Sequence, residues 1–433
     1  MELMIPCPLV LPDEPLALPE LEAHVHAWGR LIQQQALATA WAAQAGQRPS
    51  GPCPHCQSAD LRSAGTKLRK VETLFGPVRL PRRRVRCATC GRSHQPDDAG
   101  LRSVLGAGQC TPAVRDLAAI CGASWPYRQA ARVIGRLRGS PLSAETIRTV
   151  VEQTGTAVAA QQAAEAQTAC QPAARAPDTT QPRPARLVVE LDGGWVRSRD
   201  NREGMEAKVG VIHAGSERIG RTRTRLCERR YVATFGGVGA FGPLVTAAVV
   251  ARNGYEATEQ TLLGDGAAWI WTMGRTILAE ATPVLDRWHL ADARRRVLRR
   301  AVPEAEERAE WTQRIEPCLD TGDVAAARAV LTALAATVSV PEVGEFADFL
   351  TDQAPRIPNY AARRAAGQPI GSGGVEKSVD VVVNRRFKGK RGMKWRRARA
   401  EGVLALRVTE LNDEWHLRMT PILHLPAPTL PAF

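Results

Sequence analysis

The sequence lacks any run of about 18 or more apolar residues, the length that a membrane-spanning helix needs. Its first residues also lack the basic segment followed by an apolar one that marks a secretory signal. We therefore expect a cytoplasmic protein that does not engage a membrane. Acidic residues are few, with 44 Asp and Glu against 58 Lys and Arg, so the net charge is +14. A balance of this sign favours a polyanionic partner, most simply nucleic acid.

The ten cysteines lack the arrangement of a secreted disulfide framework. Four of them instead form two Cys-x-x-Cys pairs, in which a tight turn aims two thiolates at one metal ion. The pairs are Cys53 with Cys56 and Cys87 with Cys90. Two strand-like stretches between the pairs meet at Gly76-Pro77, so we expect a hairpin that brings the pairs together. This pattern predicts a zinc ribbon over residues 51–98 with one structural Zn²⁺, and His55 and His94 are possible substitute ligands.

Basic residues are dense on this predicted hairpin. A basic hairpin that a bound metal ion stabilises is a suitable surface for binding phosphates. We predict that Arg82, Arg83 and Arg84 bind DNA. Residues 1–50 contain a helical segment. Residues 110–154 read as three short helices and predict a helix-turn-helix-like DNA-binding domain, with residues 143–155 as the recognition helix. The alternative is a small helical bundle with no role in DNA binding. We expect residues 51–154 to bind duplex DNA with an affinity that falls steeply as salt rises.

A change of composition divides the chain after these modules. Residues 155–185 are rich in Ala and Gln and then in Pro, which predicts a linker. Strand and helix patterns then alternate over residues 186–288, including a polar and strongly basic strand over residues 222–234, which predicts a mixed α/β domain. Residues 289–366 are helical by pattern and read as an insertion. The α/β domain resumes over residues 367–415 with a helix whose apolar stripe is Val375, Val379, Val382, Val383 and Phe387, and residues 416–433 are a tail.

Three acidic residues follow or open predicted elements of the α/β domain. Two apolar strand-like runs end in Asp-Gly, at Asp192 and Asp265, and Glu376 lies in the first turn of a late helix for which Ser372 is the expected N-cap. Carboxylates are the hard ligands that Mg²⁺ prefers. If the two strands are neighbours, both aspartates meet at one edge of the sheet. Glu190 and Asp380 are alternative ligands, and the plainer reading is two turn aspartates and a surface glutamate.

The sequence around these acids carries a family resemblance. Its motifs are Leu-Asp-Gly-Gly at 191–194, Leu-Gly-Asp-Gly-Ala-Ala-Trp-Ile at 263–270 and Pro-Ile-Gly-Ser-Gly-Gly-Val-Glu at 369–376, followed by Asn-Arg-Arg-Phe-Lys at 384–388 and Gly-Met-Lys-Trp at 392–395. With these motifs, the chain from about Gly51 to Trp415 resembles the DDE transposases of bacterial insertion sequences, most closely the ISKra4 type. That family has a zinc-binding N-terminal region and a helical insertion before the glutamate.

The resemblance implies an RNase H-like mixed sheet with Asp192, Asp265 and Glu376 as a DDE triad that binds Mg²⁺ or Mn²⁺. It also implies cleavage and transfer of DNA strands, with the terminal repeats of the element and target DNA as partners. We expect a homo-oligomer on the DNA, associated with a bacterial nucleoid. Asp286 and His289 could support the triad, contact DNA, or serve the core or a helix cap. A late basic cluster is predicted to bind DNA: Arg385, Arg386, Lys388, Lys390, Arg391 and Lys394.

Two other functions fit the same residues. A DNA-binding regulator derived from such an enzyme would lack catalysis, although an intact triad argues against it. A metal-dependent nuclease would cleave DNA without strand transfer, and the triad alone does not separate it from a transposase.

Overall fold

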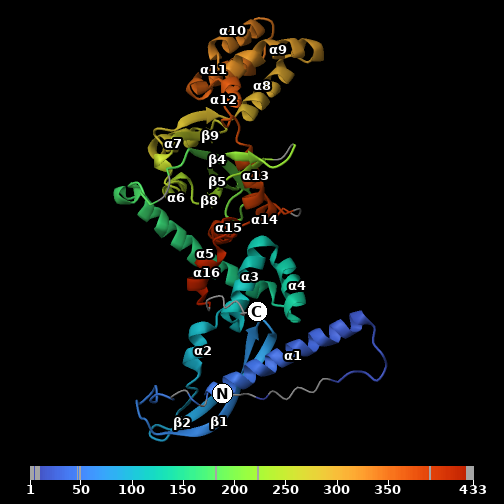
Figure 1. Cartoon of the computed structure of the whole chain (residues 1–433), viewed down its shortest axis with the longest axis vertical. Coiled ribbons are helices and arrows are strands. Elements are labelled where there is room, and N and C mark those ends of the chain that lie inside the picture. The colour runs from blue at the N-terminus through green and yellow to red at the C-terminus, as the bar shows by residue number, and fades with distance from the viewer. Residues whose placement is uncertain are drawn as a thin grey trace. The chain divides into compact units, whose positions relative to one another are not determined.

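The computed structural model describes residues 4, 10–45, 47, 50–180, 183–221, 224–389 and 392–425. The chain forms two compact units (Figure 1): the first comprises residues 1–158 and 414–433, and the second comprises residues 159–413. The division falls at the start of the predicted linker. Among the described residues, no helix combines the length and apolar character that crossing a membrane requires.

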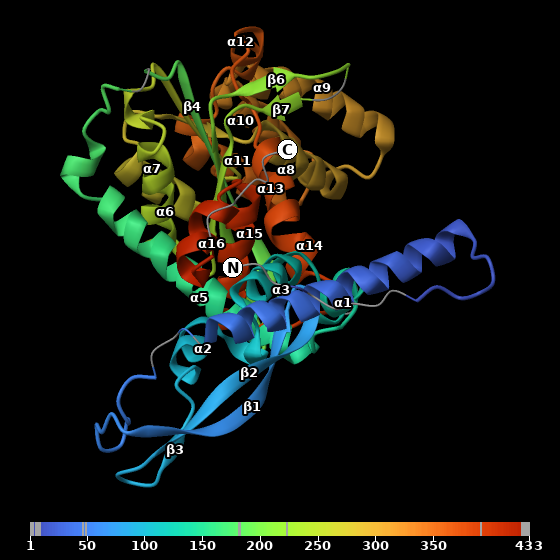
Figure 2. The same cartoon turned by 60° about the horizontal axis from the view of Figure 1, so that its bottom comes forward.

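A long antiparallel hairpin dominates the start of the first unit (Figure 2), with β1 (Leu61–Thr73) paired to β2 (Gly76–Cys87) and β2 paired to the short β3 (Ser93–His94). Side chains alternate between the two faces of a strand, so Val71, Val78 and Leu80 all point to one face and form a small buried core. Helix α1 (Leu18–Ala45) covers that core with Leu37, Ala38 and Trp41. The hairpin therefore has apolar support near its turn.

Helices make up the rest of the first unit: α2 (Asp98–Val104), α3 (Pro112–Ser124), α4 (Tyr127–Arg138), the start of α5 (Ala144–Ala169) and α16 (Trp415–Leu423). The three predicted helices are present, but α5 continues far beyond residue 155 and into the segment predicted as linker. Ala, Gln and Glu favour helices, which accounts for this extension. The first part of the predicted tail is helical and belongs to α16, which the Trp415 indole joins to α3 by donating a hydrogen bond to Asp116 at 2.8 Å.

A five-stranded mixed sheet forms the centre of the second unit, in the order β10-β9-β4-β5-β8. Its strands are β4 (Arg186–Val196), β5 (Met205–His213), β8 (Arg230–Thr234), β9 (Glu259–Gly264) and β10 (Thr282–Leu285). Strand β9 is parallel to β4 and β10, whereas β5 is antiparallel to β4 and β8. The predicted mixed α/β character is confirmed. Strand β4 contains Asp192, and the parallel neighbour β9 ends one residue before Asp265. The expected end of the first strand at Asp192 is therefore wrong, because Gly193 and Gly194 continue the pairing of β4 with β5 as far as Val196.

One predicted strand, over residues 222–234, is divided in the structure. Its first part includes β7 (Thr224–Leu226), which pairs with β6 (Ser216–Arg218) in a separate two-stranded hairpin. Its second part is β8 of the main sheet. Between them Glu228 has a φ of 49°, in the left-handed region that turns the chain. The polar, arginine-rich composition of this segment is more typical of a surface hairpin than of a strand in the core.

Helices surround this sheet and share its core. They are α6 (Val238–Val250), α7 (Ala268–Ile277), α8 (Arg287–Ala301), α9 (Ala305–Thr321), α10 (Val324–Ala335), α11 (Pro341–Gln353) and α12 (Tyr360–Ala365). Helices α8 to α12 are the predicted helical insertion and gather at one end of the unit (Figure 1). Leu285 of β10 and Leu350 of α11 belong to one continuous hydrophobic cluster, so the insertion is built into the domain.

The last part of the second unit contains α13 (Gly373–Val379), a π-helical turn over Asp380–Asn384, α14 (Arg385–Phe387) and α15 (Arg397–Leu411). The predicted apolar stripe is buried at Val375, Val379, Val382, Val383 and Phe387. The Phe387 ring lies 5.4 Å from the ring of Phe235 and 5.0 Å from that of Trp395. Short 3₁₀ turns occur at Ala107–Gln109, Pro172–Arg175, Gly254–Glu256 and Ala354–Arg356.

Candidate functional site

The four cysteines of the two Cys-x-x-Cys pairs meet at the open end of the β1–β2 hairpin, as predicted. The Sγ atoms of Cys53 and Cys90 are 3.7 Å apart, and those of Cys56 and Cys87 are 3.5 Å apart. All four sulfur atoms lie within 4.8 Å of one another. Four thiolates about 2.3 Å from one zinc ion have sulfur–sulfur distances of about 3.8 Å. The cluster therefore fits a closed structural zinc site.

Local backbone geometry favours the thiolate form at two of these cysteines, Cys53 and Cys87. At Cys56 the backbone N–H of Ser58 acts in the same direction, but the contact with Cys87 and burial raise the pKa to about 12. The Cys90 backbone N–H, aimed at the Cys87 sulfur, lowers the pKa of that thiol to about 6. A thiolate is the form that binds zinc. The two substitute ligands considered from the sequence, His55 and His94, are outside the sulfur cluster. The Nδ1 atom of His55 instead contacts a nitrogen of Arg92 at 3.2 Å.

The arginines predicted to bind DNA on this hairpin have internal partners. Arg82 forms an ion pair with Asp98, and Arg83 contacts Asp97 at 3.1 Å and donates its backbone N–H to the same carboxylate at 2.9 Å. Arg84 is partly buried. The charges of Arg82 and Arg83 are therefore neutralised from within the unit. The hairpin exposes other cations more fully: Arg62, Lys67 and Arg79.

The second candidate site is the edge of the sheet that holds two aspartates, Asp192 in β4 and Asp265 directly after β9. In the β4–β9 pairing Glu190 is opposite Leu263. Because the strands are parallel and in register, Asp192 and Asp265 come two residues later on the two strands, at the same edge of the sheet. Both are partly buried, and Gly193 and Gly266 follow them directly. The strand order therefore brings the two aspartates to the same edge of the sheet.

Glu376 of α13 faces the same region, and Asp192, Asp265 and Glu376 are called the acidic cluster below. Among the described residues, however, the carboxylate and imidazole groups whose ligand atoms lie within 4.8 Å of one another are those of Asp286, His289 and Glu376, and neither Asp192 nor Asp265 belongs to that group. Burial raises the pKa of Asp192, and the nearby carboxylates of Asp265 and Glu376 raise it further. Three carboxylates thus interact electrostatically across three separate elements. Glu376 is the most accessible of them, with 54% of its side chain exposed. A cluster of mutually repelling hard oxygen donors is a chemically suitable site for a divalent cation.

His289 of α8 lies beside the three carboxylates. Its Nδ1 is 3.5 Å from Asp286 Oδ2 and 3.8 Å from Glu376 Oε1. The Asp286 carboxylate, with smaller effects of Asp265 and Glu376, raises the pKa of His289 to about 9. The imidazole is therefore protonated at neutral pH and places a positive charge against the acidic cluster.

Asp286 is fully buried and connects two distant segments of the chain. Its Oδ1 caps α8 by accepting the backbone N–H groups of Trp288 at 2.5 Å and His289 at 3.0 Å. Its Oδ2 accepts the backbone N–H of Ser372 at 2.5 Å and the Ser372 hydroxyl. Ser372 occupies the predicted N-cap position of α13, but its hydroxyl makes no capping hydrogen bond and donates to Asp286 instead. This link holds the start of α13, and hence Glu376, next to α8.

The charge of Asp286 should stabilise the fold in a pH-dependent way. Burial alone would raise the pKa of Asp286, but hydrogen bonds from His289 and Ser372 lower it to about 2, below the value of about 4 in an unfolded chain. Its stabilisation is therefore present above pH about 4 and is lost as the pH falls through about 2.

We expect Asp286→Asn to lower the free energy of unfolding by about 1–3 kcal/mol at pH 7, because an amide N–H would face the Ser372 donors. The difference from the wild type should shrink below pH about 4. Urea denaturation of the second unit at several pH values measures this. A difference that is the same at pH 7 and at low pH would contradict the role given to the charge.

The alternative ligands, Glu190 and Asp380, already have partners. Glu190 is buried and contacts His213 Nε2 at 3.0 Å, and it also accepts the backbone N–H of Val375 at 2.8 Å. It therefore helps to anchor α13 to the sheet. Asp380 forms an ion pair with Arg385 at 3.1 Å. Neither acid belongs to the group that surrounds Asp192.

The late basic cluster has one clear correction. Arg386 is buried, with 2% of its surface exposed, and its guanidinium lies 4.8 Å from the centre of the Trp395 ring. It cannot contact DNA from this position, because helical periodicity turns it into the core while Arg385 faces out. Lys388 and Lys394 are exposed, as predicted for a surface that contacts a partner. Lys390 and Arg391 lie outside the described residues.

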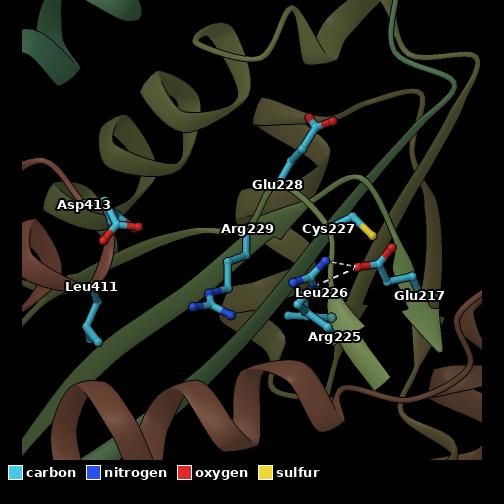
Figure 3. A pocket seen from close by; sticks show the side chains of 9 residues that line it. Glu217, Arg225, Leu226, Cys227, Glu228, Arg229, Leu411 and Asp413 are labelled. Carbon is cyan, nitrogen blue, oxygen red and sulfur yellow. Dashed lines mark hydrogen bonds and ion pairs between the residues drawn. The ribbon is translucent and has the colours of Figure 1, made fainter. Parts of the chain in front are cut away.

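A separate open pocket lies between the β6–β7 side of the second unit and the end of α15 (Figure 3). Its walls include Glu217, Arg225, Cys227, Arg229 and Asp413. Glu217 accepts a hydrogen bond from the Arg225 Nε at 2.7 Å, so the two charges facing each other in the figure are paired. None of the predicted site residues lines this pocket.

Comparison with known proteins identifies a family of unknown activity. A protein of Streptococcus gallolyticus named "UPF0236 protein in vanSb 3'region" is 26% identical over 168 residues, which are 39% of this chain and 34% of that protein. The similarity thus spans about a third of the relative's length. The model of the uncharacterised protein family UPF0236 matches residues 66–342, more than half of the chain. The chain therefore belongs to the UPF0236 family.

Proposed function

We propose that this protein is a DNA transposase that cleaves and joins DNA strands by metal-dependent phosphoryl transfer. The observation that supports the proposal is that Asp192 and Asp265 come from two neighbouring parallel strands and share one edge of the sheet, and that the charges of Asp265 and Glu376 act on Asp192. The mixed sheet and the helical insertion before Glu376 support an RNase H-like domain. The resemblance of the flanking motifs to ISKra4-type transposases points to the same chemistry.

Carboxylate oxygens are the ligands that Mg²⁺ and Mn²⁺ prefer, so Asp192, Asp265 and Glu376 are the residues that would hold such an ion in this proposal. The raised pKa of Asp192 reflects burial and the neighbouring charges of Asp265 and Glu376, and a divalent cation would relieve that repulsion. When bound, such an ion would supply activation of an attacking oxygen and stabilisation of the leaving one. The three carboxylates would hold the ion and fix its position. Asp286 and Ser372 would keep Glu376 in place, as their hydrogen bonds join α8 to α13.

Recognition of the element's ends falls to the first unit in this proposal. The zinc-stapled hairpin and helices α3 to α5 would bind duplex DNA as the predicted ribbon and helix-turn-helix. The exposed cations Arg62, Lys67 and Arg79 would contact phosphates. Two basic residues of the second unit, Lys388 and Lys394, are exposed and would meet the same polyanion.

A strand-transfer assay tests the function directly. Because the end sequence is unknown, the substrate is a pool of the DNA fragments that flank the gene, pre-cut to expose a 3′-OH and mixed with a supercoiled target plasmid. We expect covalent joining of the pre-cut end to the plasmid with Mg²⁺ or Mn²⁺ and none with EDTA.

The same assay separates the two rival functions. Metal-dependent cutting without joined product would indicate a nuclease. Binding of the flanking fragments with neither cutting nor joining would indicate a regulator. Either result would contradict the transposase proposal, and the Glu376→Gln variant is the control for contaminating nucleases.

A further inference from the structure

Helix α8 exposes a large aromatic side chain next to the acidic cluster. Trp288 follows Asp286 by two residues and precedes His289, whose Nδ1 is 3.8 Å from Glu376. Its indole is 61% exposed. A Cβ atom added at Gly371 would lie 2.6 Å from the indole, so the ring rests against the backbone just before Ser372. The tryptophan therefore lies at the rim of the candidate site with much of its surface in solvent.

The arginines of α8 differ in whether they point into the unit or out to solvent, and in whether an acidic side chain pairs with them. Two of them point inward, where Arg287 pairs with Glu316 and Asp320, and Arg294 pairs with Glu316. The outward arginines are Arg295, Arg296, Arg299 and Arg300. Arg295 pairs with Asp292 and Arg300 with Glu342. Among the described residues, no acidic side chain forms an ion pair with Arg296 or Arg299, so these two guanidinium groups are available to an anion.

The exposed residues form one continuous stripe. Positions 288, 292, 295 and 299 are separated by four, three and four residues, the spacing of a single helix face, and Arg296 adjoins them. With a rise of about 1.5 Å per residue, Trp288 and Arg299 are about 16 Å apart along the helix. That length matches about five nucleotide steps of a stacked strand. The stripe begins at Trp288 beside the acidic cluster, passes the ion pair of Asp292 and Arg295, and ends in the positive charges of Arg296 and Arg299.

We propose that this stripe binds a DNA strand that enters the acidic centre, and that Trp288 stacks on an unpaired base beside the reacting phosphate. Arg296 and Arg299 then bind backbone phosphates about three to five nucleotides away. The inference rests on the proposed function, and it adds that the strand at the centre is locally single-stranded. An indole face that is open to solvent offers stacking to a base only where the base has left its duplex neighbours.

The test measures the binding of two single-stranded probes to the full chain without divalent metal. One probe is a 5′-labelled oligothymidylate, and the other is an abasic strand with the same number of phosphates, so only the first can stack. We expect Trp288→Ala to weaken oligothymidylate binding by at least about fivefold and to leave abasic binding unchanged. Trp288→Phe keeps an aromatic face and should bind both probes nearly as the wild type does.

The arginines give a second, independent readout. Arg296→Gln combined with Arg299→Gln should weaken binding of both probes and reduce the salt dependence of log affinity by about 1.4. The control combines Arg275→Gln with Arg328→Gln, two exposed arginines on α7 and α10, and should leave the salt dependence unchanged.

Several results would overturn the proposal. Unchanged oligothymidylate binding by Trp288→Ala, or equal weakening of both probes, would refute stacking. If the α8 arginine variant lost binding to polyglutamate but not to the oligonucleotides, the stripe would be a surface for an acidic protein. The proposed function fails separately: if the wild type shows no metal-dependent strand transfer while the probes respond as expected, only the transposase proposal falls.

Discussion

Changing Asp192 or Asp265 to Asn, or Glu376 to Gln, should abolish most strand cleavage and transfer, with a loss of at least about a hundredfold for each variant. The substitutions preserve size and much of the hydrogen bonding but remove an anionic ligand. In the wild type, for example, the Asp192 carboxylate accepts a hydrogen bond from the Gly193 N–H at 2.6 Å. The side-chain amide of Asp192→Asn still has an oxygen that can accept this hydrogen bond. DNA binding and folding should therefore survive.

The same variants should reveal the cation without any activity measurement. Burial and the carboxylates of Asp265 and Glu376 raise the pKa of Asp192, so the folded state disfavours its charge. Asp192→Asn should therefore match or exceed the wild type in thermal stability near pH 7, and the gain should vanish as the pH falls to the unfolded value near 4. Mg²⁺ or Mn²⁺ should raise the Tm of the wild type and not that of Asp192→Asn.

Asp380→Asn is the matched control for the third ligand, because Asp380 is one helical turn after Glu376 and pairs with Arg385. It should retain both activity and the metal-dependent rise in Tm. An inactive Asp380→Asn beside an active Glu376→Gln would show that the glutamate is not the ligand. If Mg²⁺ or Mn²⁺ raised the Tm of all three triad variants as much as that of the wild type, the proposed metal site would be refuted, and the transposase proposal would be refuted with it.

The second large effect concerns zinc. We expect the purified chain to contain one zinc ion and Cys87→Ser to lose it, because four thiolates complete the tetrahedron and a serine oxygen is a poor replacement. The turn end of the hairpin keeps its core of Val71, Val78 and Leu80 under α1. Loss of zinc should therefore disorder mainly residues 51–66 and 83–98. Elemental analysis and hydrogen exchange measure the two effects.

Cys227→Ser is the control for general thiol damage, since Cys227 is outside the four-sulfur cluster and belongs to the second unit. It should retain zinc, and exchange in the hairpin should match the wild type. Stoichiometric zinc in Cys87→Ser, or no zinc in the wild type, would contradict the assignment. Unfolding of the sheet of the second unit in Cys87→Ser would show that the ribbon supports more than its own hairpin.

Local patterns were sufficient where neighbours in sequence decide the structure. Spacing of the four cysteines predicted their meeting, because a hairpin of matched strands must return the second pair to the first. The valine stripe from Val375 to Val383 predicted the buried face of its helices. Asp192 and Asp265 each end an apolar run, and only the adjacency of β4 and β9 was needed to bring them together.

Contacts between distant segments decided the rest. Arg82, Arg83 and Arg386 looked alike in sequence to any exposed arginine, yet the first two are neutralised by Asp98 and Asp97 and the third is buried against Trp395. The link between Asp286 and Ser372 spans 86 positions and has no periodic signal.

The sequence alone therefore determined the kinds of residues available for chemistry, namely the four thiolates and the three carboxylates, because short-range spacing sets local geometry. Tertiary structure decided which charges remain open to a partner and which are already paired. Pairing depends on long-range packing: Asp286 holds the segment of Glu376 against α8 while the same helix presents Trp288 to solvent. Burial also set the electrostatics of Asp192, because desolvation is the main cause of its raised pKa and the charges of Asp265 and Glu376 raise that pKa further.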